Sequence, residues 1–183
     1  MKKAICFLVS LLFTVPVWAE PIPSKSPELQ ELIAQLKKQY ATTSSDFGLK
    51  KMNEVNNLSY FIRFNDQPDT PEYKLLKAYL LGLQQAHISS INQQIQTNVV
   101  PWFCPRGKLK SVSLSAKNPT QMIENVIWLG LEHDLKLNPT TFTDWDGAAA
   151  FAPITGFVMY GFQTKYPCYE SIPQSHRLVG FKY

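Results

Sequence analysis

The 183-residue sequence has few glycines and little net charge. Its eight glycines and 13 prolines are scattered, which excludes a low-complexity linker protein. With 45% apolar and 17% charged residues, the composition also excludes a disordered chain. The formal net charge is only +4, and Lys2 and Lys3 contribute two of those charges. A nearly neutral chain gives no basis for nucleic-acid binding. We therefore expect one compact globular domain.

Long apolar runs are also missing, with one exception at the N-terminus. Residues 4–18 form an apolar run after a two-lysine start, and Val17 and Ala19 stand at the spacing that signal peptidase reads. We predict a signal peptide over residues 1–19, cleaved after Ala19, and a periplasmic protein. A membrane span is the alternative, but the run is shorter than the roughly 20 residues that a bilayer requires. No later segment is apolar for long enough, so we expect no membrane span in the mature chain.

Cysteine is scarce, and its placement is informative. Of three cysteines, Cys6 lies in the predicted signal peptide, which leaves Cys104 and Cys168. In an oxidising compartment an even number of cysteines is expected to pair. We predict a Cys104–Cys168 disulfide that stabilises the fold by about 4 kcal/mol in the chain-entropy model. A redox or metal pair is the alternative, but the short Cys-x-x-Cys spacing of such sites is absent.

Helix signals dominate the first half of the mature chain. Ser26-Pro27 precedes leucines at helical spacing and predicts a helix over residues 27–41. Thr70-Pro71 repeats this signal before an apolar stripe about 25 residues long. Gly82 and Ala86 in that stripe predict a close crossing with a neighbouring backbone. Residues 49–64 are interpreted as helical, although their aromatic half is also compatible with an extended segment.

The second half continues the helical pattern. Asn118 as N-cap, with Gln121 as its capping-box partner, predicts a central helix that stops before Asn138. Pro153 begins or kinks a last helix that ends before Pro167.

The predicted fold class is therefore all-α, a small helical bundle with one disulfide. We divide the chain into the signal peptide 1–19, an N-terminal helical extension 20–68, a helical core 69–168 and a C-terminal tail 169–183, whose alternating pattern is typical of an extended segment.

Catalytic and metal-binding constellations are absent from the sequence. His87 lies on an apolar stripe and is interpreted as a structural core histidine, and His176 has no local partner. Residues 132–134 (Glu-His-Asp) diverge around a helix, so we interpret them as a solvated face. Residues 144–147 begin like a calcium loop but lack its distal ligands. We expect no enzymatic activity, no metal and no cofactor.

A basic loop, residues 102–110, is the first candidate binding surface. Trp102 stands next to the predicted disulfide and is followed by Arg106, Lys108 and Lys110. Tryptophan and arginine are enriched at binding hot spots, and a disulfide would hold the loop at low entropic cost. The alternative is that Trp102 and Phe103 merely cap the core.

An acidic loop, residues 140–146, is the second candidate surface. It carries Asp144, Trp145 and Asp146. The simpler interpretation is a helix N-cap with a hydrophobic anchor.

Residues 79–168 resemble a known family. Tyr79-Leu80-Leu81-Gly82-Leu83 with Ala86, then Phe103-Cys104-Pro105-Arg106-Gly107, and finally Asn138-Pro139 and Tyr166-Pro167-Cys168 follow in the order and approximate spacing of the Rap/Tai family of periplasmic immunity proteins. That family protects bacteria from peptidoglycan amidases delivered by type VI secretion. Residues 20–68 and the tail after Cys168 have no counterpart in it.

The resemblance implies a disulfide-linked helical bundle, frequently a homodimer, that blocks an amidase by inserting a loop in its cleft. It does not say which loop. The alternative is a periplasmic helical stress or chaperone-like binding protein, similar to the acid-activated chaperones. An enzyme ranks last, because no acid, base or nucleophile converges.

Overall fold

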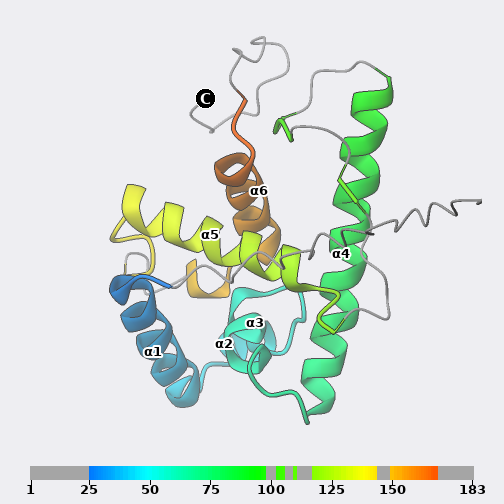
Figure 1. The fold of residues 1–183 in the computed structure, drawn as a ribbon. Coiled ribbons are helices and arrows are strands. Elements are labelled where there is room, and N and C mark those ends of the chain that lie inside the picture. The colour runs from blue at the N-terminus through cyan, green and yellow to red at the C-terminus, as the bar shows by residue number, and fades with distance from the viewer. Residues whose placement is uncertain (1–24, 98–101, 106–108, 111–116, 144–148, 169–183) are drawn as a thin grey trace, which may run out of the picture.

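The protein is described here by a computed structural model, in which residues 25–97, 102–105, 109–110, 117–143 and 149–168 are placed (Figure 1). Within these ranges every named element is a helix, which confirms the predicted all-α fold. The six helices are α1 (Pro27–Thr42), α2 (Asp46–Met52), α3 (Leu58–Phe64), α4 (Pro71–Gln96), α5 (Gln121–Leu137) and α6 (Ile154–Lys165). The predicted signal peptide and C-terminal tail lie outside the described residues.

Two of the predicted helix starts have the expected caps. The Ser26 hydroxyl accepts a hydrogen bond from the Leu29 N–H at 3.1 Å, and the Thr70 hydroxyl accepts one from the Tyr73 N–H at 3.2 Å. In each case a proline occupies the first helical turn, where its missing N–H costs nothing. Helices α1 and α4 therefore begin where local chemistry alone would place them.

The start of α5 differs from the prediction. Asn118 is not its N-cap: the helix begins at Gln121, and the Asn118 side chain instead accepts a hydrogen bond from the Thr120 hydroxyl at 3.1 Å. Gln84, a fully buried residue of α4, performs the capping. Its Oε1 accepts from the Ile123 N–H at 3.0 Å and its Nε2 donates to the Pro119 carbonyl at 2.8 Å. A tertiary contact thus replaces the predicted local cap.

Helix α5 is the centre of the bundle, as its apolar circumference predicts. It contacts α1, α4 and α6, and it runs across the molecule between α1 and α4 (Figure 1). Two glycines let α5 and α6 approach backbone to backbone. A Cβ on Gly130 would lie 2.0 Å from the Phe157 carbonyl oxygen, and one on Gly161 would lie 1.9 Å from that of Val126.

The predicted close crossing at Gly82 is wrong. Apart from the backbone of α4 itself, none of the described residues lies within 4 Å of the position that a Gly82 Cβ would take, and Ala86 is exposed as well. The face of α4 that packs into the core carries its buried residues instead: Leu76, Leu80, Gln84, Ile88 and Ile91. The small residues lie on the other side of the helix.

The first three helices are tied to the segment that precedes α6. The Tyr40 hydroxyl of α1 donates to the Ala150 carbonyl at 2.8 Å. The Leu58 N–H donates to the Ala152 carbonyl at 2.9 Å, and the Ile154 N–H donates to the Asn56 carbonyl at 2.8 Å. Residues 27–64 therefore share one hydrophobic core with α5 and α6.

Candidate functional site

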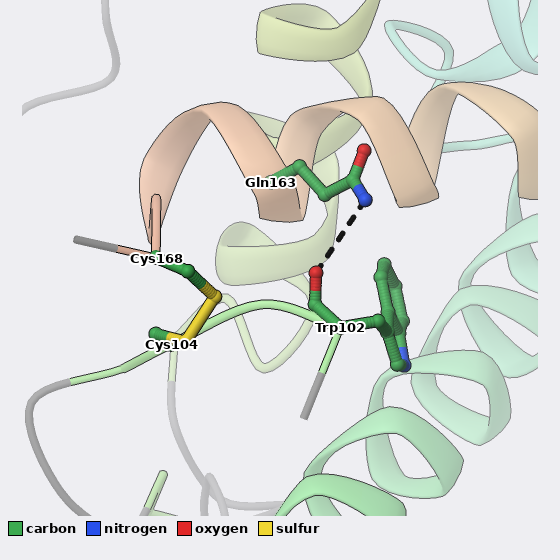
Figure 2. The surroundings of a disulfide bond; sticks show 4 residues. All are labelled: Trp102, Cys104, Gln163 and Cys168. Carbon is green, nitrogen blue, oxygen red and sulfur yellow. Dashed lines mark hydrogen bonds between the residues drawn. A yellow bond between two sulfur atoms is a disulfide. The ribbon is translucent and has the colours of Figure 1, made fainter. Parts of the chain in front are cut away.

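The Cys104–Cys168 disulfide predicted from the cysteine count is present. The two Cα atoms are 4.9 Å apart, and the bond joins the start of the basic loop to the segment after α6 (Figure 2). Two hydrogen bonds flank it. The Cys104 N–H donates to the Tyr166 carbonyl at 2.8 Å, and the Gln163 side chain donates to the Trp102 carbonyl at 3.4 Å. Residues 102–105 are thus fixed at three points to α6 and the segment that follows it.

Aromatic contacts pack residues 102–105 against the core. Phe103 is fully buried and stacks on Phe162 with ring centroids 4.7 Å apart. Trp102 meets Phe103 edge to face at 4.5 Å and remains partly exposed. The core-capping alternative therefore applies to Phe103. Trp102 packs on the same core but keeps surface that a partner could reach.

His87 of α4 completes this cluster. Its ring lies 5.2 Å from that of Phe162 and 6.0 Å from that of Trp102. Burial lowers the pKa of His87 below its ordinary value of 6.5, because the charged form loses hydration there. The side chain packs as a core histidine, which is how the apolar stripe was interpreted.

The far end of the basic loop is also held. The Asn92 side chain of α4 donates to the Leu109 carbonyl at 2.9 Å and accepts from the Leu109 N–H at 3.0 Å. Leu109 packs against the core, and Lys110 beside it is exposed. Arg106 and Lys108 lie outside the described residues. Both described flanks of these two cations are therefore anchored.

The acidic loop is only partly described. Asp144, Trp145 and Asp146 lie outside the described residues. On the N-terminal side, Phe142 is buried and stacks on Phe157 with centroids 6.3 Å apart. The structure thus describes only the start of this loop, which is fixed to α6 through Phe142.

The solvated-face interpretation of residues 132–134 is wrong for two of them. The Glu132 carboxylate accepts a hydrogen bond from the Ser26 N–H at 2.7 Å, which links α5 to the start of α1. Asp134 is buried and accepts from the Asn138 side chain at 3.1 Å. Each carboxylate thus bonds to a helix-capping residue, Ser26 at the start of α1 or Asn138 at the end of α5. The sequence around residues 132–134 does not reveal the Ser26 contact.

Among the described residues, no three metal-ligating side chains gather into a possible metal site. None of the helices in those ranges is long and apolar enough to cross a membrane.

A polar network between α3, α4 and α5 was missed by sequence analysis. Lys77 forms a 2.6 Å ion pair with Glu124 and a 3.2 Å hydrogen bond with Asn65. The Thr120 hydroxyl shares its one hydrogen between Asn118 Oδ1 and the same Glu124 carboxylate. Forty-seven positions separate Lys77 from Glu124, so no spacing rule could have paired them. Both contacts with the Glu124 carboxylate are with its Oε1, and the network links the three helices.

Comparisons with known proteins add no family assignment. No protein-family model matches the chain, and neither the curated proteins nor the solved structures yield a match.

Proposed function

We propose that the protein is an exported immunity protein that binds a cell-wall amidase and blocks it by docking the basic loop in its active-site cleft. The support comes from the anchoring of residues 102–105 and 109–110. The disulfide, the Phe103 stack and the Asn92 pair hold the two flanks of Arg106 and Lys108 in place. The amidase class rests on the resemblance to the Rap/Tai family.

Anchored flanks lower the entropic cost of docking the basic loop. A loop that docks in a cleft loses conformational freedom, and each immobilised long side chain costs about 0.5–1.5 kcal/mol. Flanks that are already fixed in the free protein lose little further backbone entropy on binding. Partly exposed Trp102 and, four positions later in the sequence, Arg106 are of the residue types that most often dominate interface energies.

Inhibition of a purified amidase tests the proposal. The enzyme should be a small cysteine amidase encoded beside this gene, with peptidoglycan hydrolysis as the readout. We expect inhibition by the protein, and a loss of inhibition of about tenfold or more in Arg106→Ala with Lys108→Ala. Lys38→Ala, an exposed lysine on α1, should inhibit normally. Hydrolysis unaffected by the unmodified protein, together with no protection of cells that express the enzyme, would refute the proposal.

The chaperone alternative is favoured by one observation, the burial of His87. Acid must charge this ring inside an aromatic cluster, which weakens the fold at low pH. That alternative expects the near-ultraviolet circular dichroism to collapse at low pH and a model client to stay soluble only there. The immunity proposal expects no suppression of client aggregation at any pH.

A further inference from the structure

We propose that a hollow between the start of α1 and the second half of α5 binds a small organic carboxylate whose apolar part lies on Trp128. The hollow has a volume of about 350 Å³. Its apolar lining includes Leu29, Leu129 and the indole of Trp128, and its rim carries Lys25, Lys136 and Glu132. This site is independent of the basic loop and of the proposed amidase.

The charge of the rim favours an anion. Glu132 is already engaged, because its carboxylate accepts from the Ser26 N–H at 2.7 Å. Neither Lys25 nor Lys136 forms an ion pair with any residue in the described ranges. Two cations against one satisfied carboxylate leave the hollow with a net positive charge. A ligand carboxylate can complete it through charge-assisted hydrogen bonds.

The position of Lys25 indicates where the apolar part would lie. Its ammonium is 4.3 Å from the centroid of the Trp128 ring. A second hollow of about 260 Å³ shares Lys25 and Trp128 with the first and is otherwise lined by different residues, Ile33 and Ile62 among them. The Lys25 side chain thus borders both hollows while its ammonium lies over the indole. A carboxylate would draw the ammonium away, because a charge-assisted hydrogen bond is stronger than an exposed cation–π contact. The uncovered indole face then accepts an apolar group.

The volume sets the size of the ligand. Small-molecule sites in proteins usually have about 300–1,000 Å³, and this hollow lies at the low end of that range. It fits a single short acid with one ring or a short alkyl chain.

Nuclear magnetic resonance titration with 4-phenylbutyrate, and with its uncharged amide as the matched probe, tests the proposal. We expect saturable shifts of the Trp128 indole N–H signal with the acid and none with the amide, the signal being assigned by Trp128→Phe. Lys25→Gln and Lys136→Gln should each weaken binding by about tenfold. Lys38→Gln removes the same charge from an exposed site on α1 and should bind like the unmodified protein.

Three results would overturn the proposal. Equal binding of the acid and the amide would show that charge plays no part. Unchanged affinity in the Lys25→Gln, Lys136→Gln double variant would place the acid elsewhere. Shifts with an acidic peptide but none with 4-phenylbutyrate would make this surface a protein contact. Circular dichroism of each variant shows that the fold is retained, and amidase inhibition by the double variant keeps this test separate from that of the basic loop.

Discussion

The space around three helical glycines differs, at Gly130 and Gly161 on one hand and at Gly82 on the other. A Cβ added to Gly130 or Gly161 would overlap a carbonyl oxygen of the partner helix, whereas one added to Gly82 would meet no described residue outside its own helix. Backbone cannot move aside as a side chain can, so the cost of an added methyl group depends on what it meets.

Substitution of these glycines by alanine tests that difference. Gly130→Ala and Gly161→Ala should each lower the free energy of unfolding by about 3 kcal/mol, because α5 and α6 must separate. Gly82→Ala should raise it by about 1 kcal/mol, because alanine is the better helix former at an exposed position. Urea denaturation with equal m-values measures both changes. A destabilised Gly82→Ala variant would contradict the open surroundings described for α4.

His87 gives the fold a pH dependence whose sign can be stated. Its pKa is lowered in the folded protein, so the unfolded chain binds more protons as the pH falls through 6.5. The free energy of unfolding should therefore be highest above about pH 6.5 and decrease below it. His87→Gln should flatten this slope, as measured by urea denaturation between pH 5 and pH 8. A slope identical in parent and variant would assign the acid sensitivity to other groups.

At the scale of elements, helices with local start signals were predictable and the junctions between helices were not. Ser26-Pro27 and Thr70-Pro71 place α1 and α4 correctly, because a cap bonds to an amide three residues away. The start of α5 depends on Gln84, and its position 39 residues from Ile123 leaves no local pattern. The Gly82 prediction failed for a related reason, since a glycine in a helix does not reveal which face is covered.

Gln84→Ala tests the tertiary cap. The substitution leaves the Ile123 N–H and the Pro119 carbonyl without their partner, and we expect a loss of about 2 kcal/mol of unfolding free energy. Hydrogen exchange at the Ile123 amide should accelerate together with it. The neighbouring Gln85→Ala lies on the partly exposed side of α4 and should change stability by less than about 0.5 kcal/mol. Equal effects of the two variants would remove Gln84 from this role.

At the scale of the whole molecule, the disulfide was predictable and its surroundings were not. Two cysteines left in a chain that is predicted to be exported have one way to pair, so Cys104–Cys168 followed from counting. The Phe103 stack and the Asn92 pair with Leu109 come from α6 and α4, and no spacing in the loop reveals them. Sequence analysis therefore identified the basic loop but not what anchors it.

Replacement of both cysteines by serine measures the contribution of the disulfide. The free energy of unfolding should fall by about 4 kcal/mol, the chain-entropy value for a loop of this length. Reductant should lower the stability of the parent protein to a similar level and leave the variant unchanged. A parent protein whose mass does not rise by two hydrogens on reduction would show that the sulfurs are not bonded.

The hydrogen bond between Tyr40 and Ala150 has a consequence for biosynthesis. Its two residues are 110 positions apart, and ribosomes add about 5–20 residues per second. Helix α1 is therefore made roughly 5–20 s before Ala150, whose carbonyl accepts the Tyr40 hydrogen bond. Over that interval α1 can contact α3 but neither α5 nor Ala150, so its packing is completed only once those later segments have been made.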